Sequence, residues 1–330
     1  MFPVVADGLV PALLTRVDRS AYDVLTPTGE ARVPALPPPH DPLDAPTVGD
    51  HLALSPVGLE VVEVLPRTSL LVRGTARGTS RAQPLAANVD HVLICLGLSG
   101  PLPLRRLERL LTLAWESGAV PVVVLTKSDL CEDVPAAVAE VQPHAPGVDV
   151  VTVSAAEGDL AGIAPYVSST LVLLGASGAG KSTIVNALLG APVMAVNGIR
   201  EADGKGRHTT THRELLVLPT GGLVIDTPGL RGVALHAGSD EGLSLAFSDV
   251  EDLATACRFA DCAHVSEPGC AVLASVEAGD LGQDRVDAWR KLQRELAFQA
   301  RRHDVRLQAE ETRKWKAIAK AQRAHFRGRP

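Results

Sequence analysis

The chain has 330 residues, a formal net charge of −6 and 46% hydrophobic residues. At roughly 100–200 residues per domain, this length predicts two or three domains. The composition is too apolar for a disordered protein, and no apolar run reaches the roughly 18 residues of a membrane span. The first residues lack the basic start of a signal peptide, and five cysteines are an odd number for a disulfide framework. We therefore expect a cytoplasmic protein with no membrane partner, whose clustered cysteines bind metal.

Short β-type segments broken by Gly, Pro and Asp occupy residues 1 to about 80. Strands are predicted at Val10–Val17, Ala21–Thr26 and Glu60–Leu65, with turns at Thr28-Gly29 and Val48-Gly49-Asp50. The segment 34–46 holds six prolines and is expected to be a loop, because proline does not continue a regular strand or helix. The pattern favours a small β-barrel of the OB type.

From about residue 86, apolar runs typical of buried strands alternate with helical spacing. Strands are expected within His91–Leu96, Pro121–Leu125, Val150–Val153, Leu171–Leu174, Leu215–Leu218 and Leu223–Ile225. A helix is predicted over Pro103–Ser117, where leucines and Trp115 recur at helical spacing. Strands that alternate with helices favour a mostly parallel α/β sheet. After about residue 245 the sequence becomes helical and charged.

The strongest motif matches the phosphate-binding loop pattern GxxxxGK[ST]. It follows an apolar strand and precedes a helix, which is the context that this pattern requires. Its predicted nucleotide-binding residues are Gly175, Ala176, Ser177, Gly178, Ala179, Gly180, Lys181, Ser182 and Thr183. Glycines let backbone N–H groups converge on phosphate oxygens, Lys181 would reach the β- and γ-phosphates, and the Ser182 hydroxyl would bind Mg²⁺.

A second element follows the strand that ends near Ile225. The sequence Asp226-Thr-Pro-Gly229 resembles the DxxG element of GTPases, in which Asp holds Mg²⁺ through water and the Gly amide senses the γ-phosphate. The stretch between the two motifs is rich in Gly and Thr at residues 204–212, as suits a first switch loop. One hydroxyl of Thr209–Thr211, assigned to Thr210, is expected to bind Mg²⁺. A threonine-rich edge turn is the alternative for this stretch.

The base-recognition motif lies upstream of the phosphate loop. Thr126-Lys127-Ser128-Asp129 follows an apolar strand, and Ser154-Ala155 follows another. The Asp129 carboxylate can accept two hydrogen bonds from N1–H and N2–H₂ of guanine, which adenine does not offer. The order of elements is therefore a circular permutation of the Ras-like order, which a compact domain tolerates when its termini lie close together. An ATP-using P-loop kinase or ATPase is a competing interpretation, against which the base motif argues.

Four metal-type ligands fall within a short stretch. Cys257, Cys262, His264 and Cys270 form a Cys₃His set, which is typical of a closed structural zinc site. Buried cysteines with an incidental histidine are the alternative. Cys95 and Cys131 are expected to be core or near-surface thiols with no assigned role.

Charge is distributed unevenly along the chain. Residues 285–330 hold 14 Lys/Arg and 5 Asp/Glu, whereas the first 284 residues hold 18 Lys/Arg and 33 Asp/Glu. A basic segment on an acidic body indicates a polyanionic partner, commonly nucleic acid, or else a solvated helix. Trp289 and Phe298 are expected to anchor this helix to the core, and Trp315 and Phe326 are candidates for stacking on RNA.

Together these motifs resemble one family, the circularly permuted GTPases that depend on the small ribosomal subunit (RsgA, also called YjeQ). The resemblance runs through VGD, VVEVLPR, LAANVDHVL, TKSD, GASGAGKST, GRHTTTHREL, DTPGL and CRFADCAH…PGCAV. It implies an OB-fold β-barrel over residues 1–82, a circularly permuted α/β P-loop GTPase domain over 83–245, and a mostly helical zinc-binding domain with a basic tail over 246–330.

The resemblance also implies a function. Members act in late maturation of the small (30S) subunit, bind it and its 16S rRNA as monomers, and hydrolyse GTP when the subunit stimulates them, as a release or checkpoint switch. One Zn²⁺ per chain, and Mg²⁺ with GTP, are the implied cofactors. The alternative is a nucleotide-gated rRNA-binding assembly factor in which hydrolysis is incidental.

Two departures from the common GTPase pattern stand out. Thr126 replaces the usual Asn of the base motif, which braces the phosphate loop and contacts the base, and threonine is shorter. Leu230 stands where Ras-like enzymes carry the Gln that orients water. The family instead implicates a histidine of the first switch loop, which is His208 here, and an imidazole can position or deprotonate water. The alternative is that His208 is an ordinary exposed loop histidine.

Overall fold

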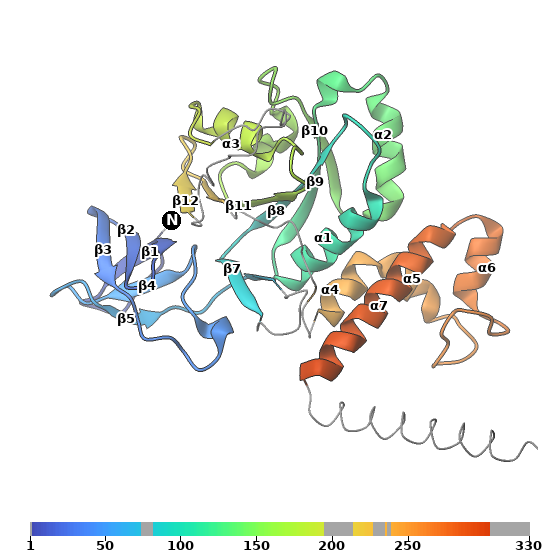
Figure 1. The fold of residues 1–330 in the computed structure, drawn as a ribbon, viewed down its shortest axis with the longest axis horizontal. Coiled ribbons are helices and arrows are strands. Elements are labelled where there is room, and N and C mark those ends of the chain that lie inside the picture. The colour runs from blue at the N-terminus through green and yellow to red at the C-terminus, as the bar shows by residue number, and fades with distance from the viewer. Residues whose placement is uncertain (1, 74–81, 195–213, 227–234, 236–238, 304–330) are drawn as a thin grey trace, which may run out of the picture.

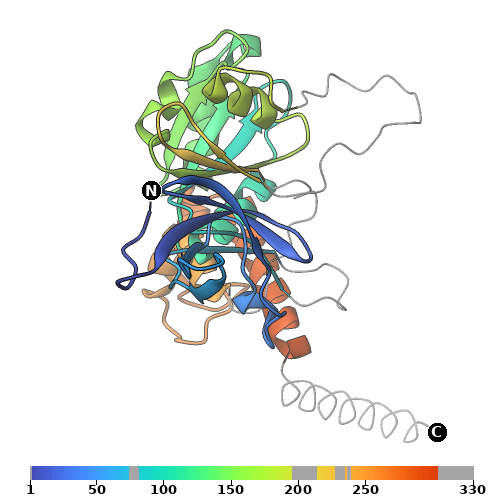
Figure 2. The same ribbon diagram turned by 90° about the vertical axis from the view of Figure 1, so that its left-hand side faces the viewer.

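The fold comprises an amino-terminal set of antiparallel strands, a central α/β sheet and a carboxyl-terminal group of helices. A computed structural model describes residues 2–73, 82–194, 214–226, 235 and 239–303. The amino-terminal strands and the carboxyl-terminal helices flank the α/β region on opposite sides in Figure 1, and Figure 2 shows the same arrangement from the barrel side. No helix among the described residues is long and apolar enough to cross a membrane.

The amino-terminal strands form a small, partly open barrel. They are β1 (Val10–Val17), β2 (Ala21–Thr26), β3 (Gly29–Pro34), β4 (His51–Leu54) and β5 (Val61–Val64). β1 pairs with both β2 and β4, β2 pairs with β3, and β4 pairs with β5, all antiparallel. This order fits the expected OB type. Alternate residues such as Leu14, Tyr22, Val24 and Leu52 fill its interior. The proline-rich segment is a loop that contains one 3₁₀ turn, Pro42–Asp44.

A buried ion pair closes this loop onto the barrel. The guanidinium of Arg67 donates to both carboxylate oxygens of Asp50, at 2.7 and 2.8 Å, and to the carbonyls of Leu43 and Ala45. Asp50 is fully buried, so this bidentate pairing offsets the cost of removing its charge from water. Asp50 of the VGD sequence and Arg67 of the LPR sequence are therefore partners in the fold.

A glycine brings the barrel close to the next hairpin. A Cβ on Gly49 would lie 2.2 Å from the carbonyl oxygen of Ala87, so no other residue fits there without a shift. The side chain of Asn88 donates to the carbonyl of Gly49 at 2.9 Å and accepts from the amide of Thr68 at 2.9 Å. The hairpin itself consists of β6 (Leu70–Arg73) and β7 (Gln83–Ala87), which form a separate two-stranded sheet.

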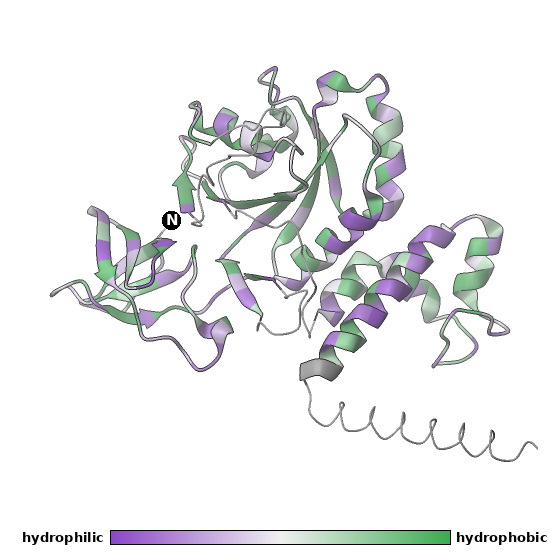
Figure 3. Ribbon diagram, viewed as in Figure 1, coloured by the Kyte–Doolittle hydropathy of each residue, from purple (hydrophilic) through white to green (hydrophobic). Residues whose placement is uncertain are grey.

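The central sheet has the strand order β10-β9-β8-β11-β13-β12. Its strands are β8 (His91–Gly97), β9 (Val120–Thr126), β10 (Asp149–Val153), β11 (Thr170–Gly175), β12 (Glu214–Val217) and β13 (Leu223–Asp226). All pairs are parallel except β12 with β13. Every strand predicted in this region is confirmed. These strands are mostly hydrophobic in Figure 3, as buried parallel strands require.

The sheet continues from the α/β region into the barrel. β12 pairs with β1 through Arg16 and Glu214, so the five barrel strands and the six strands of the central sheet form one 11-stranded sheet. The helices of the α/β region are α1 (Leu104–Glu116), α2 (Val134–Val141) and α3 (Lys181–Leu189), with 3₁₀ turns at Ser128–Leu130, Gln142–His144 and Ala161–Tyr166. Leu107, Leu110 and Leu111 on α1 are buried, as their spacing predicts.

The carboxyl-terminal helices pack on α1. They are α4 (Asp240–Ala246), α5 (Ser248–Ala254), α6 (Ala271–Ala278) and α7 (Gln283–His303). Trp289 is 5% exposed and belongs to the same core as Leu110, which confirms its predicted anchoring role. The prediction is wrong for Phe298, which is 49% exposed, because it lies two residues beyond the buried Leu296 and on another face of α7. Trp315 and Phe326 lie outside the described residues.

Candidate functional site

The phosphate loop connects β11 to α3, as the motif predicts. Gly175, Gly178 and Gly180 all have positive φ, of 150°, 81° and 80°, which favours glycine. A Cβ on Gly175 would lie 2.5 Å from the carbonyl oxygen of Cys95 on the neighbouring strand β8. The loop can therefore turn tightly at the end of β11 and present the amino end of α3, where N–H groups and the helix dipole favour an anion.

Lys181 is held inside this loop. Its ammonium donates to the carbonyls of Gly175 at 3.0 Å and of Ala176 at 2.7 Å. Burial lowers the pKa of Lys181, and the positive charge of Arg106 on α1 also lowers it, whereas nearby Asp226 raises it. A partly buried ammonium beside a helix amino terminus is suited to a ligand that brings several negative charges.

The base motif is joined directly to the phosphate loop. Thr126, at the end of β9, is 2% exposed, and its hydroxyl lies 3.0 Å from the carbonyl oxygen of Ala179 and 3.4 Å from that of Leu96. A Cβ on Gly180 would lie 3.1 Å from the same hydroxyl, so the end of β9 and the phosphate loop are in close contact. Threonine thus retains a brace to the phosphate loop in the position where the family usually has Asn.

The rest of the base motif forms an edge beside this brace. Lys127 has a left-handed backbone conformation, and its ammonium lies 3.3 Å from the Ser99 hydroxyl. The hydroxyl of Ser154 donates to the Asp129 carboxylate at 2.6 Å, and Ser154 pairs with Asp159 in a short β-bridge. Among the described residues, no hydrogen-bond donor is recorded for the second carboxylate oxygen of Asp129. Ser128 follows in the 3₁₀ turn, and Ala155 directly follows Ser154.

The predicted magnesium residues lie at the same edge of the sheet. Ser182 is in the first turn of α3, and Asp226 ends β13, the parallel neighbour of β11. Burial raises the pKa of Asp226, the positive charge of Lys181 lowers it, and the carboxylate of Glu214, opposite it on β12, raises it. A buried carboxylate under such conditions gains from a cation. Thr210, His208 and Gly229 lie outside the described residues.

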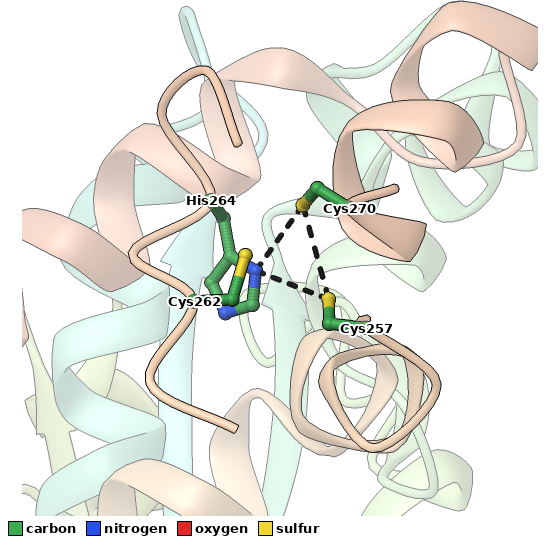
Figure 4. Close-up of side chains that lie close together, drawn as sticks. All are labelled: Cys257, Cys262, His264 and Cys270. Atoms are coloured by element: carbon green, nitrogen blue, oxygen red, sulfur yellow. Dashed lines mark hydrogen bonds between the residues drawn. The ribbon is translucent and has the colours of Figure 1, made fainter. Parts of the chain in front are cut away.

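The four predicted metal ligands come together (Figure 4). Their ligand atoms all lie within 4.8 Å of one another. Cys257 Sγ is 3.8 Å from Cys270 Sγ, and His264 Nδ1 is 3.5 and 3.4 Å from these two sulfurs. Tetrahedral ligands at about 2.3 Å for sulfur and about 2.1 Å for nitrogen would be separated by about 3.8 and about 3.6 Å. The arrangement fits a tetrahedral metal ion such as zinc.

The surrounding chain supports these ligands. The amides of Ala271 and Leu273 donate to Cys257 Sγ at 3.3 Å and Cys270 Sγ at 3.4 Å, which favours thiolates. His264 is 3% exposed, and its ring packs against Trp289 of α7 with centroids 5.4 Å apart. The site is therefore tied to the last described helix.

One supporting residue was missed by the sequence reasoning. The Glu267 carboxylate accepts from the amides of Ala263, Val265 and Ser266, at 3.1, 2.7 and 3.0 Å. Backbone hydrogen bonds, with the largest effect from the Ser266 amide, lower the pKa of Glu267 to about 2. The signal available in the sequence was a single acid inside a glycine- and proline-containing loop, which did not identify it. Ser99, the partner of Lys127, carried no signal at all.

The two remaining cysteines behave as thiols of the α/β region. Cys95 is fully buried on β8, and burial raises the pKa of its thiol to about 12. Cys131 is half-buried beside the base motif, and neither forms a disulfide. This agrees with the expectation that they are core or near-surface thiols.

Comparison with known proteins gives consistent results. A family model described as RsgA GTPase matches residues 64–236. "Small ribosomal subunit biogenesis GTPase RsgA" of Streptomyces avermitilis is 50% identical over 322 residues, which cover 95% of this chain and 87% of that protein. A Listeria monocytogenes protein named "Small ribosomal subunit biogenesis GTPase RsgA 1" is 45% identical and covers 86% of this chain and 82% of its own length.

Solved structures extend the likeness to the fold. The crystal structure of YjeQ from Thermotoga maritima superposes with a TM-score of 0.65 and 27% identity, and the match covers 87% of this chain and 98% of that one. YloQ, described as a circularly permuted GTPase, superposes with a TM-score of 0.64 and 25% identity over 89% of this chain and 98% of its own. The permuted order of elements expected from the sequence is therefore found in proteins of the same fold.

Proposed function

Because the chain belongs to the RsgA family of GTPases, we propose that it binds the small (30S) ribosomal subunit and its 16S rRNA and assists late maturation of that subunit. GTP hydrolysis, stimulated by the subunit, would act as the release or checkpoint switch. The observation that carries the proposal is the likeness, across 95% of the chain, to a relative whose name describes small-subunit biogenesis. We further infer that the protein acts as a monomer in the cytoplasm.

Guanine recognition would rest on Asp129. One oxygen of its carboxylate accepts from Ser154, which fixes the orientation of the group. The carboxylate can then accept hydrogen bonds from N1–H and N2–H₂ of guanine, and adenine would offer neither donor. Lys127, Ser128 and Ala155 would complete the base site, and Thr126 supports this site by fixing the phosphate loop beside it.

Phosphate binding and catalysis would be positional and electrostatic. The backbone of residues 175–180 and the Lys181 ammonium would hold the β- and γ-phosphates, displacing the loop carbonyls that the ammonium now contacts. Mg²⁺ bound with GTP would offset developing phosphate charge. Ser182, Thr210 and Asp226 are its proposed ligands, and Gly229 is the proposed γ-phosphate sensor.

Water would be handled by His208 in place of the glutamine found in Ras-like enzymes. Its imidazole can accept a proton from, or orient, the attacking water only when the surrounding loop is ordered. We infer that ribosomal RNA orders this loop, so the basal rate is slow and the subunit accelerates it.

We propose that the metal of the Cys257–Cys270 loop is zinc, one ion per chain. Three sulfurs and one imidazole nitrogen suit zinc better than magnesium or calcium, and four protein ligands leave no position for substrate. The role is then structural, since a closed site stabilises the loop. Metal analysis of the purified protein should give one zinc per chain, and Cys262→Ser should lose it. Retention of zinc by that variant would contradict the assignment.

The partner is tested by co-sedimentation. Purified protein is mixed with 30S or 50S subunits in the presence of GDP or a non-hydrolysable GTP analogue. We expect sedimentation with 30S subunits in the analogue and release in GDP. Equal sedimentation with 50S subunits, or binding that does not depend on the nucleotide, would refute the proposal.

A further inference from the structure

One buried guanidinium joins the carboxyl-terminal helices to the α/β region. Arg285, in the first turn of α7, is 2% exposed. Each of its five N–H groups has a partner: two go to Asp249, and one each to Glu108 and the carbonyls of Ala246 and His144. The longest of these contacts, to the His144 carbonyl, is 3.4 Å. Such complete pairing is what a buried charge requires.

These partners define a corner of the chain. Ala246 is the last residue of α4, and its carbonyl, 2.8 Å from Arg285, is one of the groups that a helix end leaves unpaired. Phe247 connects α4 to α5, is fully buried, and lies with its ring centroid 4.5 Å from the guanidinium. Asp249 is in the first turn of α5, and Glu108 lies on α1. Arg285 thus clamps the α4–α5 corner to α1.

The other end of α4 is also fixed to α1. A Cβ on Gly242 would lie 2.4 Å from the carbonyl oxygen of Thr112 and 2.7 Å from the amide of Glu116, so the two helices touch through backbone atoms. The Gly242 amide donates to the Glu116 carboxylate at 3.0 Å. α4 is therefore joined to α1 near both ends, directly at Gly242 and through Arg285 at Ala246.

α4 follows the proposed magnesium residue along the chain. Asp226 ends β13, and the next described residue, Leu235, is fully buried in the core that also contains Leu243 of α4. α1 follows β8, the strand that contributes the Leu96 carbonyl to the Thr126 hydroxyl. α4 is therefore the first helix described after Asp226, and it packs on the helix that follows β8.

We propose that Arg285 is a positioning residue for GTP hydrolysis. By joining the α4–α5 corner to α1, it fixes the first helix described after Asp226 and makes α7 part of the GTPase core. The inference rests on the proposed function for the reaction itself. Small displacements of catalytic groups reduce rates strongly, whereas nucleotide affinity depends on β9 and β11, which Arg285 does not contact.

The same helix reaches the proposed zinc loop. Trp289, one helical turn after Arg285, donates from its indole N–H to Glu251 of α5 at 2.9 Å and packs on His264. Zinc content is consequently an independent check that α5, α7 and the loop remain assembled in any variant of Arg285.

The test compares two arginine-to-lysine substitutions at the interface between α1 and the carboxyl-terminal helices. Arg285→Lys keeps a positive charge near Glu108 but loses the planar fork that reaches Asp249 and the α4 carbonyl together. Arg109→Lys is the matched control, because Arg109 also joins α1 to α7, but it does so through a two-bond pair with Glu295 at 2.6 and 2.5 Å instead of through Asp249 and Ala246. The measurement is single-turnover GTP hydrolysis per nucleotide-bound protein, with the GTP dissociation constant, zinc content and melting temperature.

Arg285→Lys should lower the single-turnover rate by about ten- to a hundredfold while GTP affinity changes by less than about twofold. Arg109→Lys should keep the wild-type rate. If Arg285→Lys does not fold, Asp249→Asn, which loosens only the α5 contact, should give a smaller loss of the same kind. Wild-type rates in the folded variant, equal losses in both arginine variants, or a loss confined to GTP affinity would overturn the inference.

The assay contains GTP and no ribosome, so it separates this inference from the proposed function. A wild-type protein that hydrolyses GTP but does not respond to 30S subunits would refute the proposed partner while the comparison of variants still stands. Normal stimulation of the wild type with an unimpaired Arg285→Lys would refute the role of Arg285 alone.

Discussion

Removing one hydroxyl from the base motif should loosen the phosphate loop. Thr126→Val keeps the shape of the side chain but deletes the donor that lies 3.0 Å from the Ala179 carbonyl. A buried carbonyl that loses its partner costs about 1–3 kcal/mol. Thr126→Ser keeps the hydroxyl and is the matched control.

The cost divides between stability and binding. If the loop stays in place, the full cost lowers the free energy of unfolding, and the melting temperature should fall by about 1–4 °C. If the free loop relaxes until water reaches the carbonyl, the cost reappears when nucleotide reorders the loop. A complete transfer of 1–3 kcal/mol to binding would raise the dissociation constant by about five- to a hundredfold.

GTP and GDP should be affected alike, because both depend on the phosphate loop. The preference for guanine over adenine should stay, because Asp129 and Ser154 do not change. Calorimetry with GTP, GDP and ATP, together with thermal melts, measures these quantities. A Thr126→Val protein with wild-type melting temperature and affinity, or one that loses guanine selectivity, would refute the role given to the hydroxyl.

Three further substitutions test the remaining assignments. Asp129→Asn should weaken GTP binding by about a hundredfold without affecting thermal stability, because it removes a charged acceptor for guanine; unchanged competition between GTP and ATP would count against it. Asp226→Asn should abolish Mg²⁺-dependent hydrolysis yet raise the melting temperature of the free protein by about 1–3 °C. The folded pKa of Asp226 is raised, so the wild-type protein loses stability as the pH rises through that pKa and Asp226 ionises, and asparagine avoids this loss. A lower melting temperature would contradict this sign. Glu267→Gln should weaken zinc binding by about tenfold, measured by chelator competition. Because the folded pKa of Glu267 is lowered from 4.5 to about 2, its contribution to the stability of the zinc loop is complete above pH 4.5 and is lost only as the pH falls toward 2. The ratio of zinc affinities of the wild-type and Glu267→Gln proteins should therefore be constant from about pH 5 to pH 8. A marked change of this ratio across that range would be evidence against the role given to Glu267.

The regular elements could largely be predicted from sequence because each has a strong local pattern. β1 and β2 have the predicted end residues, and the apolar, β-branched runs of the central sheet are all strands. β3, β4, β6 and β7 were not predicted, because four to six residues between loops carry too weak a pattern to identify a strand. The domain boundaries at residues 82 and 245 stay predictions.

The site could be predicted where it consists of motifs and not where it depends on tertiary contacts. The phosphate loop and the Cys₃His set are local in sequence, and the structure brings their residues together. The contact of Arg285 with Glu108 joins residues 177 positions apart, and neither residue type reveals such a partner. The Thr126 brace likewise depends on β9 and β11 lying on either side of β8, a spatial order that sequence reasoning did not provide.

The most direct measurement is the rate of GTP hydrolysis by the protein alone, with purified 30S subunits and with 50S subunits, and with ATP in place of GTP. We expect a slow basal rate that 30S subunits raise strongly and selectively, and no comparable reaction with ATP. The same rate with and without 30S subunits would contradict the central claim that the small subunit controls hydrolysis.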